Sequence, residues 1–166
     1  MDVSAEPNPI RLNIGAGTKA FDGWIAVGLE PQHDVQSDIR KLPFADGYAD
    51  EAMAIHVLEH LDRWDAPAAL KEWRRVLKPG GLLIIEQPEL LRCCRGILAG
   101  AAPRDGLWGL YGDPNERDPM MMHKWAWSAA ELIAELKAAG FTKIKERPLQ
   151  FHGRRAHRDM RIEARA

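Results

Sequence analysis

Short apolar runs alternate with amphipathic segments along the whole chain. Four of the runs are bounded by turn residues and predict strands at residues 10–14, 24–29, 34–37 and 49–55. A fifth run, LLIIE at residues 82–86, is apolar almost throughout, which is typical of a central strand buried on both faces. Strands that alternate with helices in this way indicate a parallel sheet covered by helices.

Two amphipathic segments predict helices. Residues 65–77 place apolar side chains at helical spacing and run into the turn-forming sequence Lys-Pro-Gly-Gly. Residues 129–139 follow Ser128, which can cap the helix, and Glu131 stands three positions later, where it completes a capping box. A further helix is expected around residues 90–98.

The end of the chain predicts two more strands, at residues 141–147 and 158–165, which we expect to form an antiparallel pair at the sheet edge. The predicted fold class is therefore α/β, a Rossmann-like doubly wound sheet that is mostly parallel with an antiparallel last strand. We expect residues 1–166 to form a single domain, with an insertion at about residues 95–127. The aromatic and methionine side chains of this insertion suit either an apolar acceptor pocket or a local core.

Composition and charge narrow the classes of function. The chain has 166 residues and a formal net charge of -1, which is not typical of a dedicated nucleic-acid binder. No run of about eighteen apolar residues and no signal-peptide pattern occurs, so we expect a cytoplasmic protein that does not enter a membrane. The only cysteines, Cys93 and Cys94, are adjacent, which suits neither a disulfide framework nor a zinc site.

Glycines follow the first predicted strand. In an open α/β sheet a ligand lies beyond the carboxyl ends of the strands, where glycines let backbone N–H groups approach it. Gly15 and Gly17 stand at this position. Glu30, near the end of the second strand, could accept hydrogen bonds from a ribose, and Asp38 could accept one from the adenine amine. These residues indicate an adenosine-type cofactor.

Four segments together, LNIGAGTK, SDIRKLPFADGYADE, HVLEHL and RRVLKPGGLLIIE, resemble the successive motifs of class I S-adenosylmethionine-dependent methyltransferases, in particular the small bacterial branch of the type 11 group. The resemblance covers about residues 10–87. It implies S-adenosylmethionine as cofactor, S-adenosylhomocysteine as product, and a small-molecule or saccharide-linked acceptor. It further implies that the cofactor is bound by Asn13, Gly15, Ala16, Gly17, Glu30, Asp38, Ile39 and His56, with His56 beside the sulfonium.

The chain departs from that pattern near the cofactor. Lys19 replaces the third loop glycine, and only about a dozen residues separate Gly17 from Glu30, so the first helix is shortened or missing. One alignment places the ribose-binding acid at Gly28. We retain Glu30 because a glutamate side chain reaches farther than an aspartate.

The remaining candidates are histidines that could act in catalysis. His123 is the first candidate for a general base and His56 the second, although a surface or hinge position would explain His123 equally well. The sequence His56-Val57-Leu58-Glu59-His60 also matches the inverted zinc-peptidase pattern, which would make the protein a zinc hydrolase using His56, Glu59 and His60. Because His56 falls at a strand end, we expect no metal site. A cofactor-binding module without transferase activity is the other alternative.

Overall fold

The computed structural model describes residues 8–18 and 21–166. Lys19, which replaces the third glycine of the loop, lies outside the described residues. Within the described part, no helix is both long and apolar enough to cross a membrane.

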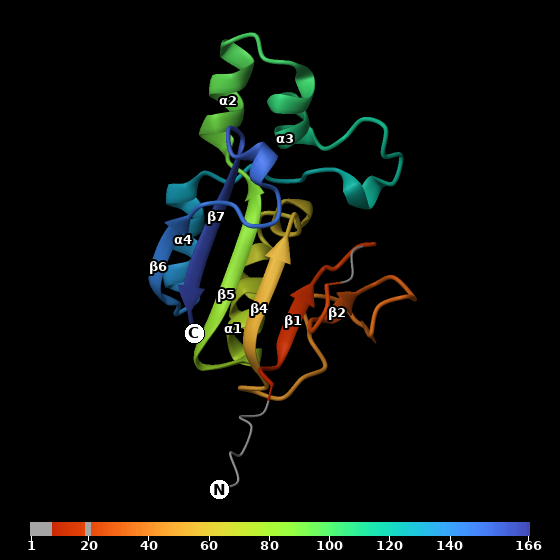
Figure 1. The fold of residues 1–166 in the computed structure, drawn as a ribbon, viewed down its shortest axis with the longest axis vertical. Helices are drawn as coiled ribbons and strands as arrows, with labels where there is room; N and C mark the ends of the chain where they lie inside the picture. The colour runs from red at the N-terminus through yellow and green to blue at the C-terminus, as the bar shows by residue number, and fades with distance from the viewer. Residues whose placement is uncertain (1–7, 19–20) are drawn as a thin grey trace, which may run out of the picture.

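The described residues build one sheet of seven strands in the order β3-β2-β1-β4-β5-β7-β6 (Figure 1). The strands are β1 (Arg11–Ile14), β2 (Ile25–Gly28), β3 (Val35–Gln36), β4 (Ala49–Ile55), β5 (Leu77–Pro88), β6 (Thr142–Arg147) and β7 (Asp159–Arg165). The first five run parallel, and β7 is antiparallel to both of its neighbours. The predicted Rossmann-like sheet with an antiparallel last strand is confirmed.

Strand β5 begins earlier than the apolar run predicts. The sequence from Lys78 to Gly81 was expected to be a turn, yet it lies within β5. The reason is tertiary, because the end of the chain pairs with it: Gly80 N–H donates to the Ala166 carbonyl at 2.9 Å, and Ala166 N–H donates to the Gly81 carbonyl at 3.0 Å. Such long-range pairing leaves no local signal in the sequence.

Helices α1 (Ala66–Val76) and α4 (Ala129–Ala138) contact each other and lie behind the sheet in the view of Figure 1. Alternate residues of the strands face them, because successive side chains of a strand point to opposite faces. The buried core on this side includes Leu12, Ile14, Ala52, Leu83, Ile85, Leu70, Trp73, Leu132 and Leu136. The other face of the sheet carries ion pairs instead, among them Arg11–Glu51 and Arg161–Glu163.

Helix α4 begins with half of the expected capping box. Ser128 Oγ accepts a hydrogen bond from the Glu131 backbone N–H at 3.2 Å, as an N-cap does. The Glu131 carboxylate, however, accepts from Arg63 Nε at 3.0 Å and from Trp125 Nε1 at 3.2 Å. The side chain that would close the box instead attaches the helix to the segments around Arg63 and Trp125.

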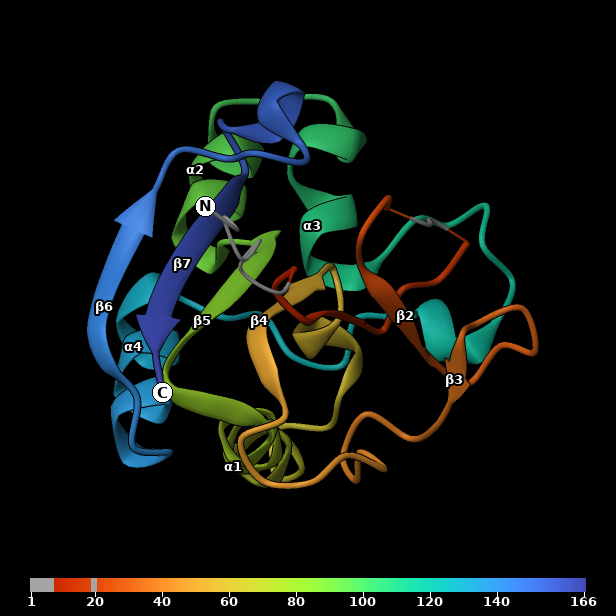
Figure 2. The same ribbon diagram turned by 60° about the horizontal axis from the view of Figure 1, so that its bottom comes forward.

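The segment between β5 and α4 lies beyond the carboxyl ends of the parallel strands (Figures 1 and 2). It contains α2 (Leu90–Leu98), η2 (Pro103–Asp105), α3 (Leu107–Tyr111) and η3 (Pro119–Met121). Arg158, just before β7, donates to the Arg104 carbonyl at 2.9 Å and so ties η2 to the sheet. This arrangement places the segment next to the edge of the sheet where Rossmann-like folds bind ligands.

Replacement of Trp73 by phenylalanine tests the core. Trp73 is fully buried, and its indole N–H donates to the Ile39 carbonyl at 2.9 Å. Because Trp73→Phe removes that hydrogen bond and leaves a small void, we expect the free energy of unfolding to fall by about 2 kcal/mol. Denaturant unfolding measures it. Trp64→Phe is the control, because Trp64 is 78% exposed, and equal effects of the two changes would contradict the assignment.

Candidate active site

The loop after β1 carries two glycines with left-handed backbone. Gly15 has φ +68° and Gly17 has φ +56°, a region that side chains other than glycine rarely adopt. The Gly15 N–H donates to the Val27 carbonyl at 2.7 Å, which pins the loop to β2. A Cβ added to Gly15 would lie 2.7 Å from the Val57 side chain, whereas one added to Gly17 would meet no described atom within 4 Å. Gly17 therefore leaves its backbone open to a ligand.

The imidazole ring of His33 lies against Gly28, the last residue of β2. Gly28 is buried there, and a Cβ added to it would lie 2.6 Å from the His33 ring. His33 Nε2 is in turn 2.7 Å from the Gly17 carbonyl oxygen, so the ring joins β2 to the glycine loop. Glu30 is exposed. The position that one alignment gives to the ribose-binding acid thus has no room for a carboxylate while His33 stays in place.

Asp38 and Ile39 follow β3. The Asp38 carboxylate accepts from Arg40 Nη2 at 2.7 Å, and Arg40 Nη1 donates to Asp65 at 2.7 Å. The hydrogen bond from Arg40, against a smaller opposing effect of burial, lowers the pKa of Asp38, which is therefore ionised at neutral pH. Ile39 is half-buried, and its carbonyl is held by Trp73. The Asp38 side chain and the Ile39 backbone are therefore both held in place next to the sheet.

His56 directly follows β4, in a strained left-handed conformation between two buried carboxylates. Its φ is +54°, and such strain concentrates at functional sites. Nδ1 lies 2.9 Å from Glu59 Oε1, and Nε2 lies 3.1 Å from Asp159 Oδ2. Burial alone would lower the pKa of His56, but the two carboxylates outweigh it and raise the pKa to about 9. The ring is an imidazolium at neutral pH, which disfavours it as a general base.

Two buried acids near His56, Asp159 and Glu86, were not predicted from the sequence. Asp159, at the start of β7, is fully buried, and its pKa is lowered because His56 and Arg158 together outweigh the effect of burial. Glu86, the polar end of the apolar run of β5, is also fully buried and accepts from the Gln150 backbone N–H at 2.6 Å. A charged residue closing an otherwise apolar strand was the available signal for Glu86. The sequence holds no such signal for Asp159, because Asp159 comes close to His56 only when β7 pairs with β5 in the folded sheet.

His123 lies at the end of the segment that covers the strands. Its Nδ1 is 2.9 Å from the Gly109 carbonyl oxygen, and its ring meets the His60 ring edge to face at a centroid distance of 4.9 Å. Burial lowers the pKa of His123, against a smaller opposing effect of Glu59. A hollow of about 270 Å³ adjoins His123, with Tyr111 and Trp125 among its walls. The ring is neutral at pH 7, which suits a general base.

The inverted zinc-peptidase interpretation fails on local geometry. That motif needs both histidines on one helix. Here His60 ends η1 (Leu58–His60), a helix of three residues, while His56 precedes it in left-handed conformation. His56 is also held in ion pairs with Glu59 and Asp159. A zinc hydrolase built on His56, Glu59 and His60 is not supported.

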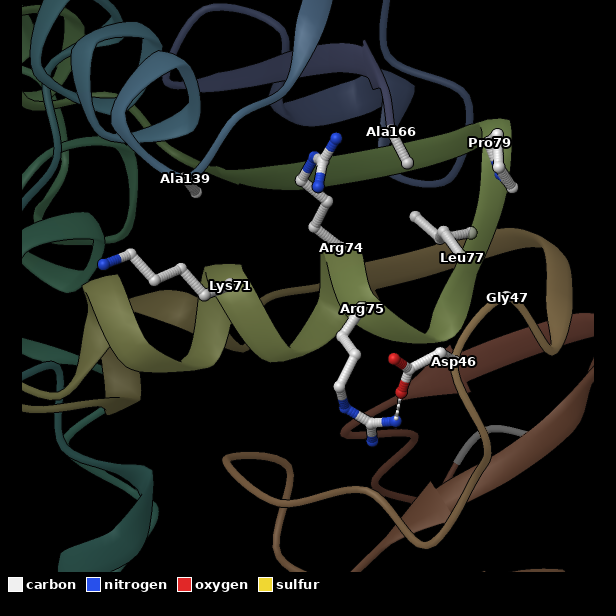
Figure 3. Close-up of a pocket in the computed structure, with 9 residues that line it drawn as sticks. All are labelled: Asp46, Gly47, Lys71, Arg74, Arg75, Leu77, Pro79, Ala139 and Ala166. Atoms are coloured by element: carbon white, nitrogen blue, oxygen red, sulfur yellow. Dashed lines mark hydrogen bonds and ion pairs between the residues drawn. The ribbon is translucent and has the colours of Figure 1, made fainter.

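A larger hollow, of about 620 Å³, lies at the opposite end of the sheet (Figure 3). It is lined by the last turn of α1 and the start of β5, including Arg74, Arg75 and Leu77. Arg75 is ion-paired with Asp46 at 2.7 Å. Because ligands of open α/β sheets bind at the carboxyl ends of the strands, this hollow is not the cofactor site despite its size.

The strand order and the glycine loop define a Rossmann-like fold of the cofactor-binding class. Residues 12–85 match the model of a known family, described as a methyltransferase domain. The match covers less than half of the chain, and the chain has the fold of the class I S-adenosylmethionine-dependent methyltransferases.

Individual relatives agree with this assignment. A probable S-adenosylmethionine-dependent methyltransferase of Mycolicibacterium smegmatis is 27% identical over 124 residues, which are 74% of this chain and 40% of that protein. A Thermotoga maritima structure, described as a possible histamine N-methyltransferase, aligns with TM-score 0.66 and 20% identity, covering 96% of this chain and 83% of its own. The Burkholderia thailandensis 1,6-didemethyltoxoflavin N1-methyltransferase, solved with S-adenosylhomocysteine, aligns with TM-score 0.64 and 18% identity over 95% and 70%. The chain thus spans two fifths of the Mycolicibacterium relative's length.

The raised pKa of His56 predicts a pH-dependent stability. The folded pKa of about 9 lies above the unfolded value of 6.5, so the stabilisation is complete below pH 6.5 and is lost as the pH rises through 9. We expect the free energy of unfolding to fall by up to about 3 kcal/mol across this window. Denaturant unfolding at several pH values measures the slope.

The matched variants for this titration are His56→Asn and His157→Gln. Asparagine tolerates the left-handed backbone of position 56 and cannot titrate, so its slope should be flatter. His157 lies beside Asp105 and outside the His56 cluster, so His157→Gln is the control for replacing a histidine elsewhere. A wild-type stability that does not vary between pH 6.5 and 9 would contradict the paired imidazolium.

Proposed function

We propose that this protein transfers the methyl group of S-adenosylmethionine to a small-molecule or saccharide-linked acceptor. The observation that carries the proposal is the open glycine loop at residues 15–17, within a segment that matches the methyltransferase domain family. A small acceptor is favoured because the Burkholderia neighbour was solved with 1,6-didemethyltoxoflavin bound. The hollow beside His123, lined in part by Tyr111 and Trp125, offers aromatic walls for such a molecule.

The residues after β1 fit the proposed cofactor. A Cβ at Gly17 would fill space that no described atom occupies, and Ala16 is buried next to it. We assign Asn13, Gly15, Ala16 and Gly17 to the methionine part, Asp38 and Ile39 to the adenine, and Glu30 to the ribose. The assignment of Glu30 requires its side chain to turn inward from an exposed position. His33 Nε2 lies 2.7 Å from the Gly17 carbonyl oxygen, next to the loop assigned to the methionine part.

The bound cofactor supplies an electrophilic methyl on a sulfonium, so the protein needs no nucleophile of its own. Cationic His56 lies between the carboxylates of Glu59 and Asp159, and Arg158 pairs with the same Asp159 carboxylate at 2.7 Å. These two cations and two anions balance one another. We assign His123 as the base. Nδ1–H donates to the Gly109 carbonyl, so the lone pair of Nε2 is available to accept a proton from the acceptor.

An acceptor panel tests the proposed reaction directly. The purified protein is incubated with methyl-labelled S-adenosylmethionine and a range of small amines, phenols, carboxylic acids and saccharides. We expect label in at least one acceptor class and matching release of S-adenosylhomocysteine. Tight cofactor binding with no transfer to any acceptor would contradict the proposal and would favour the non-catalytic cofactor-binding module.

Gly17→Ala tests the cofactor loop. The methyl group enters the open space beside the loop, so we expect the affinity for S-adenosylhomocysteine, measured by calorimetry, to fall at least about tenfold. Gly23→Ala is the control: Gly23 has φ +77° and also meets no described atom within 4 Å. Both variants carry the same kind of backbone strain. Equal affinities in the two variants would place the cofactor elsewhere.

His123→Gln tests the base. We expect kcat on the acceptor that the panel identifies to fall by about 10²- to 10⁴-fold, while the affinity for S-adenosylhomocysteine stays the same. Because the pKa of His123 is lowered, wild-type kcat should stay flat near pH 7 and fall only on acidification below the usual histidine pKa of 6.5. His157→Gln serves as the control variant. Retained turnover in His123→Gln would remove this residue from the mechanism.

A further inference from the structure

Three potential metal ligands meet where η1 touches the segment before α4. One ligand atom from each of Glu59, His60 and His123 lies within 4.8 Å of the other two. Donors bound tetrahedrally to one zinc ion lie about 3.4 Å apart, so the three would have to close by at most about 1.5 Å. Small side-chain rotations provide such a movement.

In each of the two histidines, Nδ1 contacts a backbone carbonyl and Nε2 remains for a metal ion. His60 Nδ1 lies 3.2 Å from the Met122 carbonyl oxygen, and His123 Nδ1 lies 2.9 Å from the Gly109 carbonyl oxygen. A neutral imidazole that donates through Nδ1 carries its lone pair on Nε2. Backbone carbonyls hold metal-binding histidines in this way, because the contact fixes the tautomer and orients the ring.

The carboxylate supplies the independent observation that points to a ligand. Glu59 is 2% exposed, and its Oε1 is engaged by His56. Its Oε2 is buried with no hydrogen-bond partner among the described residues. A buried carboxylate oxygen without a partner is costly, and a cation beside it would remove that cost.

The backbone keeps the two halves of the cluster together. Glu59 and His60 lie in η1, directly after β4, whereas His123 lies at the far end of the segment that covers the strands. The Lys124 N–H donates to the Glu59 carbonyl at 2.8 Å, and the Trp125 N–H donates to it at 3.3 Å. The three donors are therefore part of a built junction and are not brought together by chance at the surface.

We propose that Glu59, His60 and His123 form a binding site for a divalent transition-metal ion of the zinc type. Two imidazole nitrogens and one carboxylate oxygen suit zinc and its neighbours in the first transition row, whereas magnesium and calcium prefer oxygen ligands throughout. Three protein donors leave a coordination position for an exogenous group. His123 also lines the hollow of about 270 Å³, so that position is accessible to a small molecule.

The proposed metal site shares His123 with the proposed methyl transfer, so metal binding has a consequence for that reaction. An ion would take the Nε2 lone pair of His123 that otherwise accepts the acceptor's proton. The ion would then acidify a bound hydroxyl directly, as metal ions do with bound water. Binding of the metal therefore exchanges one means of activating the acceptor for another.

Metal binding is measured on the untagged, chelator-stripped protein without cofactor. Zinc is titrated by calorimetry, and cobalt is titrated by its visible absorption, which reports the ligand geometry. We expect one ion per chain, and an affinity at least about tenfold weaker in His60→Gln and in His123→Gln. His157→Gln keeps its full affinity, because His157 lies beside Asp105 and outside the cluster. Thermal melts verify that each variant is folded.

The outcomes separate this site from the proposed function. Stoichiometric binding that both cluster variants lose supports the site. Failure of the wild type to bind either ion, or equal affinity in the cluster variants and in His157→Gln, overturns it. The same preparations are tested for S-adenosylhomocysteine binding, so a wild-type protein that binds the nucleoside but no metal overturns the metal site and leaves the proposed cofactor site standing.

Discussion

The junction between the sheet and the segment that covers it depends on Glu59. Its buried carboxylate binds His56 at the end of β4, and its backbone carbonyl receives the N–H groups of Lys124 and Trp125. Buried charge is tolerated only when it is paired, so Glu59 and His56 must be placed together as the protein folds. One residue thus fixes the end of a central strand and the position of His123 at once. The imidazolium and the neutral histidine keep their relative places because of it.

At the cofactor edge the protein uses backbone more than side chains. The loop after β1 is held by its own N–H groups to Val27, and Gly17 is linked through its carbonyl to His33. The connection between β1 and β2 is short, so few side chains are available there to hold the loop. Because no full helix covers that connection among the described residues, the imidazole of His33 takes over part of the bracing that a packed helix gives in longer members of the fold class.

The sequence predicted the sheet because each strand of the core has a local signature. The limits of β4 and α2 agree with their apolar patterns, and Ser128 caps α4 as its position suggested. The site was harder to predict. Asp159 reaches His56 only because β7 pairs with β5, and Glu131 leaves its capping box because Arg63 lies nearby. Interactions across more than a hundred residues, or across two packed elements, leave no periodic trace in the chain.

His56 and His123 show why a residue type alone could not assign the base. Both are largely buried, and burial by itself favours the neutral ring. Around His56, two carboxylates reverse that preference and raise its pKa to about 9. Around His123, burial outweighs both the charge of Glu59 and the hydrogen bond to the Gly109 carbonyl, so its pKa is lowered. Histidine is therefore a cation at position 56, next to the end of β4, and a neutral proton acceptor at position 123, in the segment that covers the strands. Both rings lie close to the same carboxylate: His56 pairs directly with Glu59 at 2.9 Å, whereas a ring nitrogen of His123 lies within 4.8 Å of it, and this difference in contact separates the two protonation states.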